Sequence, residues 1–272
     1  MREVQVMSRL WVCLTIIPSF SANMPDPLNY KHYQFKRGYV HVIQLSASEW
    51  KPNIVAELKG LNMITRFKNK QQWSINGSFF GHSKQGMRPV GALKINRTWV
   101  NQIASNRGII GWQQNHKDIK WYFDRPQLTK QGWCSSYHTD RWWEKADDVI
   151  AGAPLLVYNY KAVDVSSENL RHSFIHKRYA RSMLCLLSNG AIKLFIVNGS
   201  DGLLHTLRLY KKGVNIKELT QIALNENCMH AINLDGGYSS MLVGQHRIIR
   251  GVPFRWLPSR KVANAITFNK AL

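Results

Sequence analysis

Acidic residues are scarce in this sequence. Its 272 residues include 16 Asp and Glu against 37 Lys and Arg, a formal net charge of +21 at pH 7. Such a charge attracts anions over long range. The basic residues are scattered in short doublets such as Lys211-Lys212 and Arg260-Lys261, without the basic arm or stripe of a dedicated nucleic-acid binder. We therefore expect electrostatic association with anionic surfaces and no specific nucleic-acid binding.

Long apolar runs are also absent. Beyond the N-terminus, no stretch approaches the roughly 18 consecutive apolar residues of a membrane-spanning helix. The N-terminus itself carries Arg2 and Arg9, then an apolar run over residues 10–17, then a segment over 18–22 whose small residues suit cleavage. This order is typical of a secretory leader. We predict a signal peptide over residues 1–22 and a secreted or periplasmic protein; the alternative is that the run forms a buried N-terminal strand.

Cysteine is limited to four residues, none of them at CxxC spacing. Cys13 falls in the predicted leader, which leaves Cys134, Cys185 and Cys228 in the mature chain. An exported protein can form one disulfide among these three and keep one free thiol, and the sequence leaves the pairing open.

The histidines show no metal-binding pattern. The ten of them form no HxH or HExxH spacing, and no HxxxH pair with an acidic residue nearby. We therefore predict no metal site and no cofactor. A structural calcium ion, held by backbone carbonyls and Asp235, is the one cation that the sequence leaves open.

Alternating apolar residues and turn signals predict several strands. Residues 37–45 alternate with a period of two, and residues 72–75 form a short strand that ends at Asn76. In a third segment, Asn189-Gly190 has the composition of a type I′ hairpin turn. Three hairpins are expected, over residues 91–100, 108–123 and 181–197.

Two helices are expected as well. At residues 216–225, Asn215 and Glu218 stand at the positions of a capping box. At residues 52–68, Pro52 stands near the first turn and apolar side chains recur at spacings of three and four, namely Ile54, Leu58, Leu61 and Ile64. We therefore predict an α+β fold with a central mixed or antiparallel sheet flanked by helices, in a single domain over residues 37–270.

Two strand ends carry polar residues followed by glycine. An apolar run over residues 229–234 leads directly into Asp235-Gly236-Gly237, and Ser239 adds a hydroxyl. Asn76-Gly77 repeats this design with an amide side chain, and the aromatic pair Phe79-Phe80 that follows can form the wall of a pocket. Glycines let backbone approach a ligand closely. Each segment alone fits an ordinary turn equally well.

Taken in order along the chain, these motifs resemble the phosphodiester glycosidase domain family. The likeness spans about residues 40–268 and depends on the order of the motifs as well as on their residues. The family includes a lysosomal enzyme that removes N-acetylglucosamine from a phosphodiester-linked mannose. The matching segments are Asn76-Gly-Ser-Phe-Phe80, Ala151-Gly-Ala-Pro-Leu-Leu156, Arg181 before a hairpin, the helix within residues 213–225, Asn233-Leu-Asp-Gly-Gly-Tyr-Ser-Ser240 and Ser259-Arg-Lys-Val-Ala-Asn-Ala-Ile266.

The sequence departs from the family pattern at three places. Ser78 follows Gly77 where the family often has two glycines, and Tyr238 stands where a small residue is common. The run after Arg181 is Ser-Met-Leu-Cys, without the family's usual small pair and nearby glycine. We expect these changes to lie on the pocket wall and to alter the choice of substrate rather than the fold.

The resemblance implies an exported hydrolase that cleaves the glycosidic C1–O bond of a sugar-1-phosphodiester, with an N-acetylglucosamine-type sugar as a candidate. Because phosphate already leaves as a stable anion, positive charge matters more here than a general acid. We assign Asp235 as the carboxylate that attacks the anomeric carbon or activates water, Arg181 as the phosphate clamp, and Asn76 as a hydrogen-bonding partner of sugar or carboxylate.

A second group of residues is expected to bind the substrate without reacting. Gly236 and Gly237 provide backbone access, and Gly77 plays the same part in the first motif. Ser239 and Arg88 are candidate substrate contacts. Asp201, which lies between Ser200 and Gly202, is the candidate second carboxylate, and a turn role is equally consistent with its spacing.

The sequence leaves two other classes of function open. A phosphodiesterase that acts at the P–O bond would depend on metal, and the usual His and Asp clusters are missing from the sequence. A non-catalytic glycan-binding or cell-surface protein would stack sugars on its aromatic residues. Its function would survive the substitution Asp235→Asn.

Overall fold

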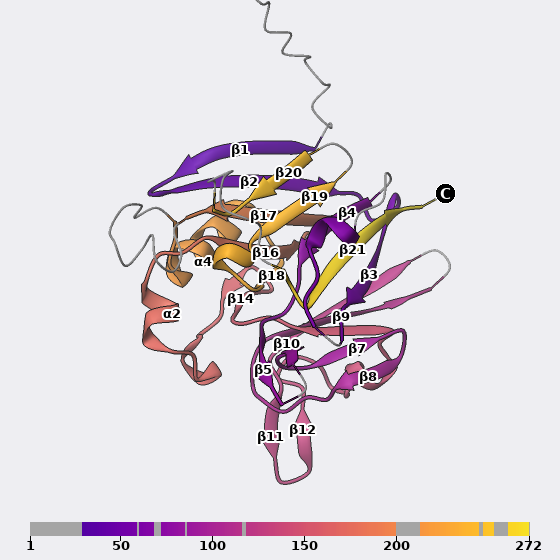
Figure 1. The fold of residues 1–272 in the computed structure, drawn as a ribbon. Coiled ribbons are helices and arrows are strands. Elements are labelled where there is room, and N and C mark those ends of the chain that lie inside the picture. The colour runs from indigo at the N-terminus through magenta and orange to yellow at the C-terminus, as the bar shows by residue number, and fades with distance from the viewer. Residues whose placement is uncertain are drawn as a thin grey trace, which may run out of the picture.

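Antiparallel β-sheets dominate the chain (Figure 1). The computed structural model describes residues 29–58, 60–67, 72–84, 86–115, 118–199, 213–244, 247–252 and 261–271. The predicted signal peptide and Asp201 lie outside the described residues. No helix in the described part of the chain is long and apolar enough to cross a bilayer.

The largest sheet has seven strands, and we call it the seven-stranded sheet. All of its strand pairs are antiparallel. Its order is β1 (Tyr30–Phe35), β2 (Gly38–Leu45), β17 (Ile192–Asn198), β16 (Arg181–Leu186), β18 (His230–Asn233), β14 (Leu155–Tyr158) and β15 (Lys161–Ala162).

Two five-stranded sheets pack beside it. The β9 sheet has the order β10 (Ile119–Asp124), β9 (Ile109–Gln114), β13 (Asp148–Ala151), β7 (Leu93–Ile95) and β8 (Thr98–Asn101). The β4 sheet has the order β20 (Arg247–Arg250), β19 (Met241–Gly244), β4 (Gln72–Asn76), β21 (Asn264–Lys270) and β3 (Trp50–Ala56).

Two separate hairpins complete the strands. They are β5 (Phe80–Ser83) with β6 (Gly86–Pro89), and β11 (Gln127–Thr129) with β12 (Gly132–Cys134). The helices are short: α1 (Trp142–Lys145), α2 (His172–His176) and α4 (Ile216–Asn225), with 3₁₀ turns η1 (Ile64–Phe67), η2 (Ser166–Glu168) and η3 (Gly237–Ser239).

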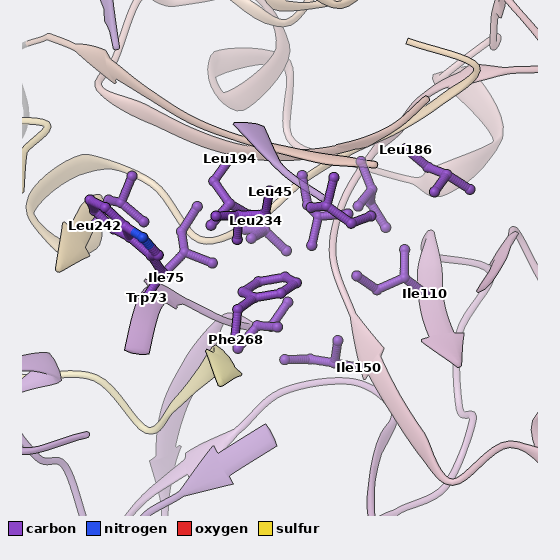
Figure 2. Close-up of a cluster of buried hydrophobic side chains, with 14 of the residues drawn as sticks. Leu45, Trp73, Ile75, Ile110, Ile150, Leu186, Leu194, Leu234, Leu242 and Phe268 are labelled. Carbon is purple, nitrogen blue, oxygen red and sulfur yellow. The ribbon is translucent and has the colours of Figure 1, made fainter. Parts of the chain in front are cut away.

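The main hydrophobic core lies where the three sheets meet (Figure 2). Leu45 and Leu194 come from the seven-stranded sheet, Ile75 and Phe268 from the β4 sheet, and Ile110 from the β9 sheet. The opposite face of the seven-stranded sheet is covered by α4, whose Leu219 and Ile222 are fully buried. Apolar burial on both faces of this sheet excludes water from its central strands β16, β17 and β18.

The predicted α+β fold with a sheet flanked by helices is wrong. The described chain is mostly β-sheet, in several sheets, with three short helices. The error began at residues 52–68, where the structure has the strand β3 followed by the 3₁₀ turn η1. Trp50, Pro52 and Ile54 are buried alternately along β3, so the period of two decides the structure there. Because β3 is an edge strand, it accommodates a proline.

The predicted hairpins are confirmed, but the turn at Asn189-Gly190 is not of type I′, since Gly190 has a positive φ of +80° and Asn189 does not. Residues 91–100 form β7 and β8, residues 108–123 form most of β9 and β10, and residues 181–197 form β16 and β17. The capped helix is confirmed too: the side chain of Asn215 accepts from the backbone N–H of Glu218, and the Glu218 carboxylate accepts from the N–H of Asn215.

A disulfide joins Cys185 of β16 to Cys228, with Cα atoms 5.6 Å apart, and Cys134 is free. Cys228 lies between α4 and β18. The crosslink therefore ties the helix-to-strand connection to the centre of the seven-stranded sheet, and it is compatible with an extracellular location.

Candidate active site

Hydrogen bonds join the segment that follows β18, at Asp235, to the end of β4, at Asn76. Asp235 follows β18, which lies between β16 and β14. Its backbone N–H donates to the Gly77 oxygen at 3.0 Å, and the Asn76 side-chain amide donates to the Asp235 backbone oxygen at 2.7 Å. The two motifs singled out in the sequence therefore form one site.

Asn76 is fully buried, and both the nitrogen and the oxygen of its side-chain amide form hydrogen bonds. Besides donating to Asp235, it accepts from the Ser182 hydroxyl at 2.7 Å and from the Met241 N–H at 3.0 Å. These contacts join β4, β16 and β19 to the Asp235 segment. The structure thus gives Asn76 a positioning role in the folded chain, where the sequence suggested contact with sugar or carboxylate.

Close packing around residue 77 leaves no room for a Cβ atom, so glycine is required there. A Cβ atom at this position would lie 2.1 Å from Oδ1 of Asn264 and 2.8 Å from Cδ1 of Ile150. The Asn264 side chain accepts from the Ser78 N–H and donates to the Ser78 hydroxyl, both at 2.8 Å. Asn264 and Ser182 were not predicted as site residues. Asn264 does lie in the last matching motif, which was the one available signal.

The Asp235 carboxylate is partly exposed, and its Oδ1 accepts from the Gly236 N–H at 2.8 Å. Gly237 has a φ of +62° and donates its N–H to the Ala180 oxygen at 2.9 Å. A left-handed backbone at this point suits glycine, and it turns the chain sharply into η3. The Asp235 carboxylate therefore lies beyond the end of β18, and hydrogen bonds hold its backbone in place.

Two buried hydroxyls follow directly. Ser239 and Ser240 are each 1% exposed, and their Oγ atoms have no hydrogen-bonding partner among the described residues. Buried polar groups are normally paired. The Ser239 hydroxyl is therefore available to a bound molecule only through a local opening of this segment.

Arg181 is a buried cation. Its side chain is 1% exposed, and the guanidinium donates to the backbone oxygens of Phe174 at 2.6 Å and Lys177 at 3.5 Å. It also lies over the Phe174 ring, 4.5 Å from the centroid, and that ring packs edge-on against Phe79 at 5.7 Å. Arg181 thus connects β16 to α2, and Phe174 connects α2 to the first motif.

The other predicted residues have distinct locations. Gly236 packs beside Arg181, since a Cβ built on it would lie 3.8 Å from the arginine Cδ. Arg88 is exposed on β6, opposite Gly81 of β5. Within the described ranges, no group of three or more His, Cys, Asp or Glu residues could hold a metal ion.

A buried carboxylate that the sequence did not reveal supports the neighbouring segment. Glu168 is 1% exposed and accepts from the N–H groups of Gly108 and Leu155, at 2.9 and 2.8 Å. Burial raises its pKa to about 7, although the two N–H groups lower it. The residues before Leu155 bind Asn233, whose N–H donates to the Pro154 oxygen. Glu168 therefore supports the chain beside the strand that carries Asp235.

The two joined motifs place the Asp235 carboxylate just after the end of β18. A family model described as phosphodiester glycosidase matches residues 69–269. The chain belongs to the phosphodiester glycosidase family, as its motif order predicted. Its family is one of glycosidases, which are hydrolases. No curated protein matches the sequence.

Solved structures share the fold at low identity. A hypothetical protein from Synechocystis has a TM-score of 0.66 at 16% identity, and this chain covers 88% of its own length and 61% of that protein. The zebrafish N-acetylglucosamine-1-phosphodiester alpha-N-acetylglucosaminidase catalytic domain, auto-inhibited by its pro-peptide, has a TM-score of 0.59 at 14% identity, with 89% and 81% covered. A putative exported protein from Burkholderia pseudomallei has a TM-score of 0.60 at 13% identity, with 86% and 74% covered.

Proposed function

We propose that this protein is an exported enzyme that hydrolyses the C1–O bond of a sugar-1-phosphodiester, with Asp235 as its reacting carboxylate. The observation that carries the proposal is the double attachment of Asp235 to Asn76 and Gly77. This attachment fixes the backbone of one carboxylate while its side chain stays partly exposed. A preorganised group of this kind is what a reacting residue requires.

In the proposed reaction, a reacting carboxylate matters more than a general acid. As the C1–O bond breaks, its electron pair passes to the phosphate oxygen, which is stable as an anion without protonation. The Asp235 carboxylate either bonds to C1 or takes a proton from the water that does. Water supplies the oxygen that ends on C1, and its proton is released.

Positive charge beside the site supports the same chemistry. Arg181 is buried, and its Cδ lies 3.8 Å from a Cβ built on Gly236; a buried charge acts through a lower effective dielectric than an exposed one. We propose that it stabilises negative charge on the phosphate from behind the Gly236 backbone. Gly77, Gly236, Gly237, Ser239 and Arg88 remain our candidate substrate contacts, and Asp201 remains the candidate second carboxylate.

Export is part of the proposal. The leader-like segment over residues 1–22 and the disulfide between Cys185 and Cys228 both support it. The net positive charge supports a phosphorylated glycan as partner. An N-acetylglucosamine-type sugar is proposed first, because the zebrafish enzyme of similar fold is named for that sugar.

Release of free sugar from a panel of sugar-1-phosphodiesters, including N-acetylglucosamine-phosphate-mannoside, tests the proposal. We expect the wild-type protein to release sugar and Asp235→Asn to lose at least about 100-fold in kcat. Asp118→Asn, at an exposed aspartate in a hairpin, is the matched control and should keep full activity.

Circular dichroism should show the same spectrum and thermal midpoint for all three proteins. Equal sugar release by wild type and Asp235→Asn, or no release from any donor, would contradict the mechanism. Release of a sugar phosphate in place of free sugar would point to cleavage at P–O.

A further inference from the structure

We infer that the protein carries a second saccharide site, built from tryptophans of β8, β12 and α1 beside the β11–β12 hairpin. A cavity of about 390 Å³ lies there between β8, β12 and α1. It shares no lining residue with the site around Asp235. Its lining residues are Trp99, Gln102, Ile103, Gln131, Gly132, Trp133, Arg141, Trp143 and Glu144.

Aromatic rings form the apolar part of this cavity. Trp99 and Trp133 are partly exposed, whereas Trp143 is 4% and Ile103 is 9% exposed. The face of an aromatic ring is electron-rich and attracts weakly positive C–H groups. One face of a pyranose ring presents such C–H groups, so these tryptophans suit a sugar stacked on them.

Polar side chains surround the rings. Gln102, Gln131, Arg141 and Glu144 are all exposed at the rim. Amide, guanidinium and carboxylate groups together offer both donors and acceptors. A sugar hydroxyl needs both, because it donates once and accepts twice. An apolar floor with a few polar groups is the common form of a small-molecule site.

Hydrogen bonds and an ion pair hold the rim side chains in place, and the charges of Arg141 and Glu144 are opposite in sign. Arg141 donates to the Gln131 backbone oxygen at 2.9 Å and forms an ion pair with Glu144 at 3.4 Å. Beneath it, the buried Lys94 ammonium donates to the backbone oxygens of Trp143 and Glu144 and lies 5.5 Å from the Trp99 ring centroid. Arg141 and Glu144 offset each other at the rim, and the buried Lys94 ammonium is engaged by two backbone oxygens, so we infer a neutral saccharide rather than a phosphorylated one.

Two other cavities differ in their lining. One of about 630 Å³ is lined by residues such as Asn53, Asn96 and Asp148, and one of about 450 Å³ by residues such as Gln44, Ser46 and Asn189. Neither has an aromatic side chain in its lining. The tryptophan cavity is therefore the one of the three that suits stacking.

Calorimetric titration of the Asp235→Asn protein tests this site without turnover. The probes are methyl α-D-mannopyranoside, N-acetylglucosamine, chitobiose and cellobiose. We expect at least one to bind saturably, with the affinity lowered about tenfold or more by Trp99→Ala. Tyr160→Ala, which removes an exposed aromatic ring outside the cavity, is the matched control and should leave binding unchanged.

A second variant guards against misfolding, because Trp99 also packs on a buried cluster. Gln102 is exposed, so Gln102→Ala should keep the thermal midpoint and weaken binding about threefold. Absence of binding by all four sugars would overturn the inference, and so would affinities unchanged by both variants. Binding of a proline-rich peptide but of no sugar would also overturn it, in favour of a peptide groove. Because these readouts need no catalysis, failure of the proposed hydrolysis would leave them unaffected.

Discussion

The side-chain amide of Asn76 donates a hydrogen bond of 2.7 Å to the backbone oxygen of Asp235, a residue 159 positions away. Asn76 is the last residue of β4 and Asp235 follows β18, and these strands belong to different sheets. The placement of the proposed reacting carboxylate therefore depends on the packing of two sheets against each other. Stability and activity should consequently be linked at this contact.

Asn76→Ala should reduce both the stability and the activity of the enzyme. The substitution leaves Asp235 O, Ser182 Oγ and Met241 N without their partner in a buried position, and such losses cost about 3 kcal/mol in total. Urea denaturation measures the free energy of unfolding, and sugar release measures kcat/KM. Asn115→Ala, on an exposed hairpin turn, should change neither. An unaltered stability of Asn76→Ala would contradict the positioning role.

Glu168 should make the protein less stable as the pH rises from about 4.5 to about 7. Its folded pKa is raised to about 7 by burial, above the ordinary value of 4.5. The folded state therefore holds a proton that the unfolded state has released, and this contribution, up to about 3 kcal/mol, is complete below pH 4.5 and lost as the pH rises through 7.

Thermal midpoints recorded across this pH range provide the measurement. Glu168→Gln has no charge to titrate, so its profile should be flatter than that of the wild type. It should also be less stable at every pH, since an amide offers one acceptor oxygen to two N–H groups. The exposed Glu144, replaced by Gln, should keep the wild-type profile. Parallel profiles for wild type and Glu168→Gln would show that this carboxyl is not the source of the pH dependence.

Reduction of the disulfide should destabilise the protein. Cys185 and Cys228 are 43 positions apart, and closing a loop of that length in the unfolded chain corresponds to about 3–4 kcal/mol. Guanidinium denaturation with and without dithiothreitol measures this difference. Cys185→Ser should behave like the reduced wild type and should respond little to dithiothreitol. Cys134→Ser, at the free thiol, should behave like the oxidised wild type; a loss of stability there would argue for a different pairing.

Local sequence signals were sufficient for the short-range elements. The hairpin at Asn189-Gly190 and the capping box of Asn215 and Glu218 involve residues close together in the sequence, so turn and capping chemistry alone predicts them. Residues 52–68 show the limit of this approach. Apolar residues there satisfy a helical spacing, but pairing of β3 with β21 decides the structure, and β21 lies more than 200 residues further along the chain.

The amino-acid sequence by itself determined the family, the order of its motifs, the hairpins and the charge, and it supplied Asp235 as the candidate carboxylate. Each of these follows from residue identity or from neighbours along the chain. Only the tertiary structure decided that the fold is mostly β-sheet, that Cys185 pairs with Cys228, and that Asn76 and Gly77 hold Asp235. These features depend on which distant segments are packed together. Burial of the core shared by the three sheets decides which segments pack together, and no local pattern in the sequence encodes this packing.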